Sequence, residues 1–514
     1  MTDTPWLGDA CSLVDAFRSG DRSPLEELEA SLAAIEASDL NCFSFLDPER
    51  ARAAAADADL AKPFGGVPFG VKELESVTGW PDTQASLLFA GRVAETTGTT
   101  VGRAMDQGGA VPVGLTTASE FGGLNVSITK LNGVTHNPWK HGRTCGGSSC
   151  GSAAAVAGGL VALASGGDGG GSLRIPGGYT GLIGFKGTYG RTSRGPSAYS
   201  RPGTVVLGNM ARSVRDAARY YDVVCGLDRT DPTSLPSAGT WEADLGSHDL
   251  RGRKVAILPS IGGVTLDPGV EEHTRARAEE LAAATGMEII DISLELPNLA
   301  AQWAMGNLST LIPELGSMWP SRRKDLTFEM EVGTMLAETF YNIHVAGVAE
   351  ERRVLAYRAM AEAFGQVDFI MSATNPGPAF PAEKTNSSPN RTALDVLAES
   401  PLLDRVARAG LGAIRVAGSV SPRFPNQILD FVTEQAPDVV TMGGLTIISN
   451  LYGNPAVSIP ASTIDGLPVG LQVLAAPHAD PLLFDVALAA ERHMPWPLVA
   501  PGVDAVDLRS VPAR

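Results

Sequence analysis

The amino-acid sequence predicts an α/β fold, because short apolar runs alternate with glycine clusters and with stretches of helical spacing. Between residues 65 and 228, apolar runs at 67–71, 110–115 and 160–164 have the length of strands that follow one another through turns and helices. The alternation returns in residues 254–292. No segment repeats with a period of about 20 to 50 residues, which argues against a solenoid or a propeller.

Helices are expected in the N-terminal part, residues 1–64. Residues 12–61 are rich in Ala, Leu and Glu, and Ser23 before Pro24 is typical of a helix start. Apolar residues then recur at helical spacing at Leu25, Leu28, Leu32 and Ile35. These features predict two helices.

Proline and small polar residues accumulate at 228–239, which marks either a domain boundary or a surface loop. The elements expected after it are a strand at 254–258, a helix at 269–284, a strand at 286–292, a mainly helical insertion at 294–437, strands within 450–474 and a closing helix at 481–493.

Composition excludes several classes of partner. The 514 residues carry a formal net charge of −17, which repels phosphate backbones and anionic membrane surfaces. We therefore expect neither nucleic acid nor a membrane as a partner. Five cysteines without a C-x-x-C spacing are typical of reduced thiols, and the first residues carry no export signal. The longest nearly apolar run, 153–164, is too short to span a bilayer, so a cytoplasmic protein is predicted.

Two clusters of glycine and serine, at 144–152 and 166–176, form the densest signal in the chain. Consecutive N–H groups in such a turn can form a nest that binds an anion. If Ser172 attacks a carbonyl, its own N–H and those before it lie near the oxygen that becomes negative, as an oxyanion hole requires. The candidate donors before it are Gly169, Gly170 and Gly171. A structural glycine turn with solvated serines is the alternative.

Other glycine-rich sites are disfavoured. Neither cluster has the Lys-Ser or Lys-Thr of a phosphate-binding loop, and the glycine spacing departs from the dinucleotide fingerprint. Residues 147–151 do match the G-x-S-x-G nucleophile elbow, which would make Ser149 a nucleophile with His478 as the best available histidine. That alternative leaves the second cluster and Lys72 without a role.

A serine nucleophile needs a base, and Lys72 is the strongest candidate. It follows an apolar run with Val67, Phe69 and Val71, whose burial would depress the lysine pKa. Keeping a lysine neutral at pH 7 takes roughly 4 to 5 kcal/mol, given a reference pKa near 10.4. A lysine that snorkels from a strand end is the alternative. The sequence contains no metal-binding motif, so we expect neither a metal nor a cofactor.

Further motifs accompany Lys72 and the two clusters along residues 25–497. They are Gly70-Val71-Lys72, Gly146-Gly147-Ser148-Ser149, residues 168–176, Gly184-Phe185-Lys186, residues 211–216, Asn450, Gly453 and residues 466–472. In combination they resemble the amidase signature family, whose members hydrolyse amides with a Ser-cisSer-Lys triad.

The resemblance implies the amidase signature fold, an α/β fold with a large mixed central β-sheet flanked by helices on both faces. It also implies that Ser172 attacks the amide carbonyl, that Ser148 relays the proton, and that Lys72 is the base. The peptide between Gly147 and Ser148 would be cis. Supporting roles behind the triad fall to Ser149, Asp168 and Arg174.

On this basis residues 1–514 are expected to form a single amidase domain. It would consist of N-terminal helices at 1–64, a signature core at 65–228, a variable insertion at 294–437 and the C-terminal part of the core at 450–497. Because the family places its pocket partly beneath variable segments, the candidates for substrate contact are Cys145, Ala373 and Thr446.

Some residues depart from the family pattern. Ile175 replaces the glutamine that the resemblance leads us to expect in A subunits of glutamyl-tRNA amidotransferases, which favours a free-standing hydrolase of a small-molecule amide. Cys150 and Glu73 also stand where other residues are usual, without removing a member of the triad. The alternatives are a carbamate, hydrazide or ester hydrolase, a non-catalytic protein, or one subunit of an amidotransferase, and a homodimer is left open.

Overall fold

The computed structural model describes residues 4–196, 203–297, 299–384 and 443–503. The strands of its main sheet are β1 (Phe43–Leu46), β2 (Pro68–Lys72), β3 (Val111–Thr116), β6 (Leu163–Asp168), β7 (Ile183–Lys186), β8 (Val206–Ala211), β9 (Lys254–Ile257), β10 (Glu288–Ile289), β11 (Phe369–Ala373), β12 (Ala456–Ile464) and β13 (Leu467–Ala475). A separate hairpin joins β4 (Ile128–Thr129) to β5 (Gly133–Val134).

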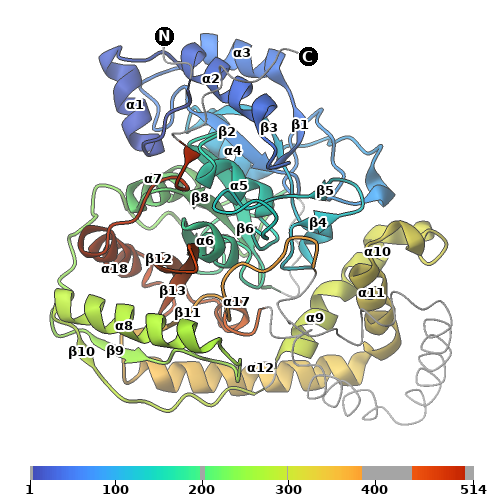
Figure 1. The fold of residues 1–514 in the computed structure, drawn as a ribbon. Coiled ribbons are helices and arrows are strands. Elements are labelled where there is room, and N and C mark those ends of the chain that lie inside the picture. Colours follow the sequence, from blue (N-terminus) through green and yellow to red (C-terminus); the bar gives the residue numbers. More distant parts are fainter. Residues whose placement is uncertain (1–3, 197–202, 298, 385–442, 504–514) are drawn as a thin grey trace.

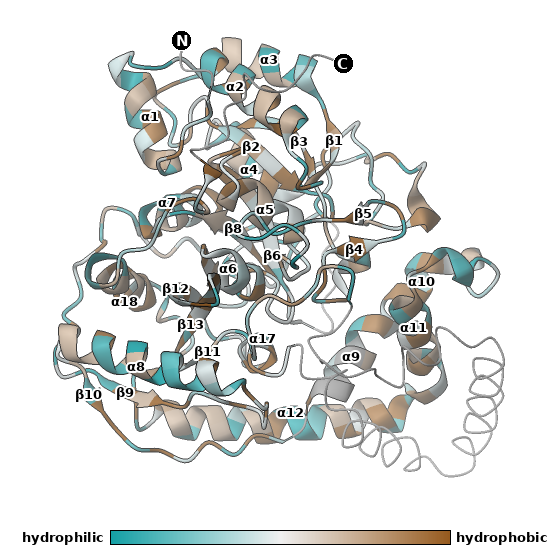
Figure 2. Ribbon diagram, viewed as in Figure 1, coloured by the Kyte–Doolittle hydropathy of each residue, from teal (hydrophilic) through white to brown (hydrophobic). Residues whose placement is uncertain are grey.

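Within the described ranges the main sheet has eleven strands in the order β1-β3-β2-β6-β8-β7-β12-β13-β11-β9-β10 (Figure 1). Parallel pairs, such as β2 with β3 and with β6, stand beside antiparallel pairs, such as β12 with β13. The sheet is therefore mixed, and the predicted α/β class is confirmed. Figure 2 shows hydrophobic residues on strands such as β2 and β3, which agrees with their complete burial.

Helices pack on both faces of the sheet. They are α4 (Thr99–Asp106), α5 (Cys150–Ala157), α6 (Arg174–Thr180), α7 (Val214–Val224), α8 (Pro268–Thr285), α12 (Ile343–Phe364), α17 (Ile447–Tyr452) and α18 (Asp480–His493). Side chains alternate across a strand, so Phe369 and Met371 of β11 pack in one cluster with α7, α8 and α18. Ile370, between them, packs in another cluster with α12 and α17.

The N-terminal part contains three helices and a strand, so the prediction of two helices was wrong. The helices are α1 (Ala10–Ser19), α2 (Pro24–Ala37) and α3 (Pro48–Ala56), and β1 follows α2. The helix start at Ser23 is confirmed, because its side chain accepts from the Glu26 N–H in a capping box. Strand β1 is four residues long and pairs only with β3 at the sheet edge, which leaves little periodicity for a sequence pattern to show.

The later elements agree with expectation except at two places. Strand β9, helix α8 and helix α18 are confirmed, whereas β10 is only two residues long. The stretch 228–239 forms turns and loop between α7 and β9. The insertion predicted as mainly helical contains α9 (Ala300–Ser309), α10 (Leu311–Leu315), α11 (Phe328–Phe340) and α12, but it also contains β11. That strand is part of the main sheet, so the predicted helical insertion at 294–437 is interrupted by a strand of the core. Residues 385–437 lie outside the described residues.

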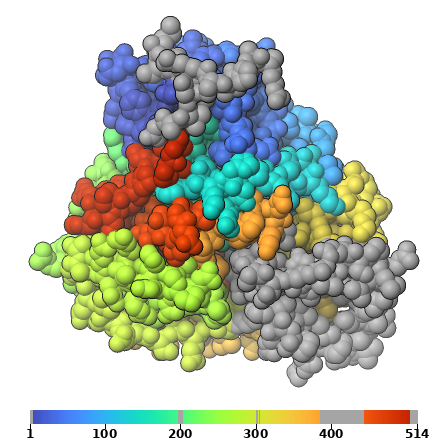
Figure 3. Space-filling view, in the orientation of Figure 1, coloured from blue at the N-terminus to red at the C-terminus, as the bar shows by residue number. Residues whose placement is uncertain are grey.

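Segments far apart in the sequence meet on the surface. Residues 142–144 pair with residues 380–382 through backbone hydrogen bonds, and the two segments touch in Figure 3 as cyan and orange. None of the helices in the described ranges is both long enough and apolar enough to cross a membrane.

Candidate active site

Lys72 is the last residue of β2, a strand whose five residues are all buried between β3 and β6. The lysine side chain is 2% exposed. Its Nζ lies 2.8 Å from Ser148 Oγ, 2.9 Å from Ser149 Oγ and 3.5 Å from the carbonyl oxygen of Gly167. The strand therefore delivers the amine into a buried polar pocket lined by two hydroxyls.

Burial lowers the pKa of Lys72 to about 8, although the neighbouring Glu75, Cys150 and Asp168 act in the opposite direction. A neutral lysine amine has two N–H donors and one lone pair. It can donate to Ser149 and to the Gly167 carbonyl while it accepts the Ser148 hydroxyl proton. The arrangement is suited to a base that takes a proton from Ser148.

Ser148 and Ser149 stand immediately before α5. The peptide between Gly147 and Ser148 is cis, which is the geometry that the resemblance implies. The backbone around Ser148 is held on both sides, because the Gly147 N–H donates to Asn125 Oδ1 at 3.0 Å and the Ser119 N–H donates to the Ser148 carbonyl at 3.2 Å. These contacts fix the direction in which the Ser148 side chain leaves the chain.

Ser172 lies in the loop between β6 and α6, and it is 9% exposed. Within the described residues its side chain makes no hydrogen bond, and it does not bond directly to Ser148. The structure thus joins Lys72 to Ser148 by a hydrogen bond and leaves the buried Ser172 hydroxyl without a partner among the described residues.

The glycine loop before Ser172 is only partly available as an oxyanion hole. The Gly171 N–H donates to Asp168 Oδ1 at 2.7 Å and is therefore not available to an oxyanion. The structure corrects the prediction of Gly171 as a donor of the oxyanion hole. In the described part of the chain, the N–H groups of Gly169, Gly170 and Ser172 have no acceptor. These three donors are free to face an oxyanion.

A fully buried ion pair supports this loop from behind. Arg174 contacts Asp168 through Nε and Nη2, both at 2.9 Å, in the bidentate geometry that is strongest for this pair. Although burial alone would raise the pKa of Asp168, the Arg174 guanidinium holds that pKa well below its usual range. Asp168 is therefore ionised and accepts N–H bonds from the turn that carries Ser172.

Residues distant in sequence complete this support, and motif reading assigned them no role. Arg174 Nη1 donates to Gln472 Oε1 at 2.7 Å and Nη2 donates to Asn450 Oδ1 at 2.6 Å. Trp303 of α9 donates from Nε1 to the Gly169 carbonyl at 3.1 Å. Nothing in the sequence around Trp303 signals this contact, because α9 reaches the loop only through the tertiary fold.

Three residues predicted to contact substrate have other positions. Cys145 and Ala373 are fully buried, the first in a cluster with α5 and the second within β11, so neither lines an open pocket. Thr446 is also fully buried, and its hydroxyl donates to the Gly170 carbonyl at 2.5 Å. These assignments are corrected: two are core residues, and Thr446 holds the glycine loop.

The nucleophile elbow is not assembled as a triad. Ser149 Oγ contacts Lys72 and the Gly167 backbone, whereas the ring Nδ1 of His478 lies 3.5 Å from Arg191 Nη2 and the backbone N–H of His478 donates to Thr188 Oγ1. The described ranges also contain no group of three or more His, Cys, Asp or Glu side chains arranged to hold a metal ion.

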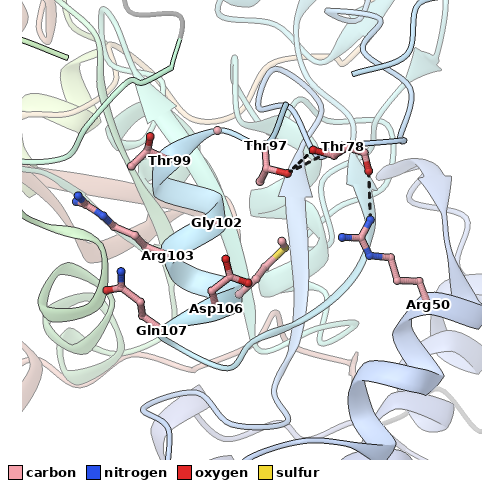
Figure 4. Close-up of a pocket in the computed structure, with 10 residues that line it drawn as sticks. Arg50, Thr78, Thr97, Thr99, Gly102, Arg103, Asp106 and Gln107 are labelled. Carbon is pink, nitrogen blue, oxygen red and sulfur yellow. Dashed lines mark hydrogen bonds between the residues drawn. The ribbon is translucent and has the colours of Figure 1, made fainter. Parts of the chain in front are cut away.

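A different cavity lies along α4 (Figure 4). It measures about 490 Å³ and is lined by residues that include Arg50, Thr78, Arg103 and Asp106. None of the predicted site residues lines it, so it is separate from the arrangement around Lys72.

Comparison with known proteins agrees with the fold and the motifs. A model of the amidase family matches residues 26–425. The A subunit of glutamyl-tRNA(Gln) amidotransferase from Salinispora arenicola is 31% identical, with 96% of this chain and 98% of that protein aligned. The corresponding protein of Deinococcus radiodurans is 32% identical, with 94% and 96% aligned.

Solved structures share the fold along almost the whole chain. 6-Aminohexanoate cyclic dimer hydrolase has a TM-score of 0.80 at 26% identity, covering 97% of this chain and 99% of its own. A bacterial aryl acylamidase of the amidase signature enzymes has a TM-score of 0.81 at 22% identity, covering 99% of both chains, which is a likeness of fold.

The chain belongs to the amidase family, in its amidase signature form, and the family supports action on amide bonds. The placement outside the amidotransferase A subunits is not confirmed, because the sequence relatives described above are A subunits.

Proposed function

We propose that the chain is a free-standing hydrolase that cleaves the carboxylic amide bond of a small molecule through an acyl-enzyme on Ser172. Ser148 relays the proton, and neutral Lys72 accepts it. The observation that carries the proposal is the buried amine 2.8 Å from a serine hydroxyl, beside a loop with unengaged N–H groups.

In acylation, Ser172 Oγ bonds to the carbonyl carbon while its proton passes to Ser148 Oγ and the Ser148 proton passes to Lys72 Nζ. The carbonyl oxygen becomes an oxyanion that the N–H groups of Gly169, Gly170 and Ser172 stabilise. The C–N bond then breaks as the proton returns through Ser148 to the departing nitrogen. Water adds to the acyl carbon by the same relay and frees Ser172.

The link between Ser148 and Ser172 is part of this proposal. Catalytic hydrogen bonds are often long before substrate binds and tighten in the complex. The unbonded Ser172 hydroxyl and the fixed Ser148 backbone are compatible with such a change.

The test is a panel of anilides, primary amides, esters, hydrazides and carbamates, assayed with the purified chain and its variants. We expect Ser172→Ala to lower turnover by about 10⁴-fold or more. Lys72→Ala should lower kcat far more than it changes KM. Ser152→Ala is a matched control, because Ser152 is a buried serine of α5 that pairs with Thr116 and not with Lys72. Equal turnover by Ser172→Ala and the wild type would refute the proposal.

A second candidate is one subunit of an amidotransferase, which the 31 to 32% identity to the A subunits of glutamyl-tRNA(Gln) amidotransferases favours. Such a protein would depend on partner chains for its activity. Turnover of a model anilide by the purified chain alone would support the free-standing hydrolase. Activity that emerges only with added partner subunits would support the second candidate.

A further inference from the structure

A short turn, η2 (Glu120–Gly122), lies against Ser148. The residue before it, Ser119, donates its N–H to the Ser148 carbonyl at 3.2 Å. A Cβ built on Gly122 would lie 3.4 Å from Ser148 Oγ, so the backbone of the turn forms one wall around that hydroxyl. Phe121 in the middle of the turn has a φ of 52°, which a bulky residue rarely adopts.

The carboxylate of Glu120 is buried and anchors this turn to two other segments. Its Oε1 accepts from Ser86 Oγ at 2.6 Å. Its Oε2 accepts from both the N–H and the hydroxyl of Thr327, each at 2.7 Å. Thr327 directly precedes α11, which belongs to the variable insertion, so a single side chain ties the wall around Ser148 to the first turn of α11.

A carboxylate is the group that accepts all three hydrogen bonds in the direction that the structure shows. Both oxygens receive hydrogen atoms, and a glutamine has only one oxygen that can accept. In Glu120→Gln the amide oxygen can still accept from Thr327, but the NH₂ group then faces Ser86 Oγ, so that hydrogen bond must reverse its direction and the Ser86 hydroxyl must turn away, although the side chain keeps nearly the same volume. The substitution therefore loosens the turn on one side without opening a cavity.

Other contacts join the same turn and the residues after it to the segment around α11. A Cβ on Gly123 would come within 2.7 Å of Met330 Sδ in α11, and Lys130 Nζ donates to the Lys324 carbonyl at 2.9 Å. The stretch that follows Ser119 therefore packs on the insertion at several points, and Glu120 is its buried polar anchor.

We infer that Glu120 is a positioning residue that fixes the relay hydroxyl of Ser148 by tying the turn beside it to the insertion. The inference rests on the proposed function, since it assigns Glu120 an effect that passes through Ser148. It predicts that Glu120 matters to the reaction only while Ser148 is present.

The test compares Glu120→Gln in two backgrounds, wild type and Ser148→Ala, with kcat and KM measured on an amide that both turn over. In the wild type we expect kcat to fall about 10-fold or more, because a displaced Ser148 hydroxyl relays the proton less well, with a smaller change in KM. In Ser148→Ala the same substitution should change kcat less than about twofold. If Glu120 acts only through the Ser148 hydroxyl, its effect on kcat disappears when that hydroxyl is absent, so the effects of the two substitutions are not additive.

Glu27→Gln is the matched control. Glu27 is a fully buried glutamate of α2 that accepts from the Trp6 N–H and pairs with Arg22 at 2.6 Å. We expect it to lower the melting temperature while leaving kcat unchanged. Thr327→Val removes one of the three donors to Glu120, so it provides a milder version of the test should Glu120→Gln fail to fold; its effect on kcat should likewise vanish in Ser148→Ala.

The inference is overturned if Glu120→Gln lowers kcat by the same factor in the wild type and in Ser148→Ala. It is also overturned if Glu27→Gln lowers kcat as much as Glu120→Gln does. Should Glu120→Gln not fold, an unchanged kcat in Thr327→Val overturns it. A Ser148→Ala variant with wild-type kcat would instead refute the proton relay of the proposed function, so the two failures are distinguishable.

Discussion

Lys72→Met is expected to abolish amide turnover and to stabilise the fold near neutral pH. Burial lowers the pKa of Lys72 from near 10.5 to about 8. One pKa unit corresponds to about 1.4 kcal/mol, so the folded state is penalised by about 3 kcal/mol for holding this lysine at pH values below 8. The unfolded chain binds the proton more tightly than the folded chain. The stability of the wild type therefore rises with pH between about 8 and 10.5.

Methionine keeps the length of the side chain without its charge. The substitution removes the penalty, but it also removes the hydrogen bonds of Nζ to Ser148 and Ser149. It leaves the buried Glu75 carboxyl, whose pKa is already raised by burial, without its positive neighbour. The net gain at pH 7 is therefore expected to be smaller than about 3 kcal/mol. Its pH dependence is the sharper signal, because the advantage of the variant must shrink as the pH rises from 8 to 10.5.

The assay is urea denaturation followed by circular dichroism at pH 7, 8, 9 and 10 for both proteins. The exposed Lys254→Met serves as control and should change the free energy of unfolding by less than about 0.5 kcal/mol at every pH. A Lys72→Met variant whose stability relative to the wild type does not change with pH would refute the depressed pKa.

Three further outcomes follow. The wild-type kcat/KM should rise with pH and level off above about 8, because only neutral Lys72 is a base; a profile that is flat from pH 6 to 9 would contradict this. Arg174→Leu leaves a fully buried carboxylate unpaired and should destabilise the fold by about 3 to 5 kcal/mol, whereas the exposed Arg52→Ala should change stability little; similar losses of stability by denaturation would contradict it. Gly170→Ala places a methyl group 2.5 Å from an indole carbon and should lower kcat about 10-fold or more, whereas Gly91→Ala, with open space around it, should not; equal rates would contradict this.

Lys72 and the two serine clusters could be found from sequence because each belongs to a recognisable local pattern, whereas the relay role of Ser148 was implied by the resemblance to the amidase signature family. Lys72 closes an apolar strand, and Ser148 and Ser172 stand in glycine clusters on either side of one helix. Such signals are contiguous in the chain, so they survive without knowledge of the tertiary fold. The α/β class followed from the same alternation of short apolar runs and glycine turns, and the mixed central sheet was implied by the family resemblance.

Features that depend on distant partners could not be found in this way. Strand β11 is five residues long and follows a 22-residue helix, and its place in the sheet is set by pairing with β13 and β9. The contact of Trp303 with the glycine loop likewise depends on where α9 packs. No local pattern carries that information.

The corrected site residues show a related limit. Spacing alone suggested that all the N–H groups before Ser172 were available, but Asp168 takes the one at Gly171. Cys145 and Ala373 are small apolar residues, and such residues enter the core as readily as they line a pocket.

The account depends most directly on a covalent bond between substrate and Ser172. The decisive measurement is mass spectrometry of the protein after a short incubation with an activated aryl ester or a fluorophosphonate, followed by peptide mapping. The account predicts one adduct, located on Ser172, that forms much more slowly in Lys72→Ala and is absent in Ser172→Ala. An adduct on Ser149, or one that forms equally fast without Lys72, would contradict it.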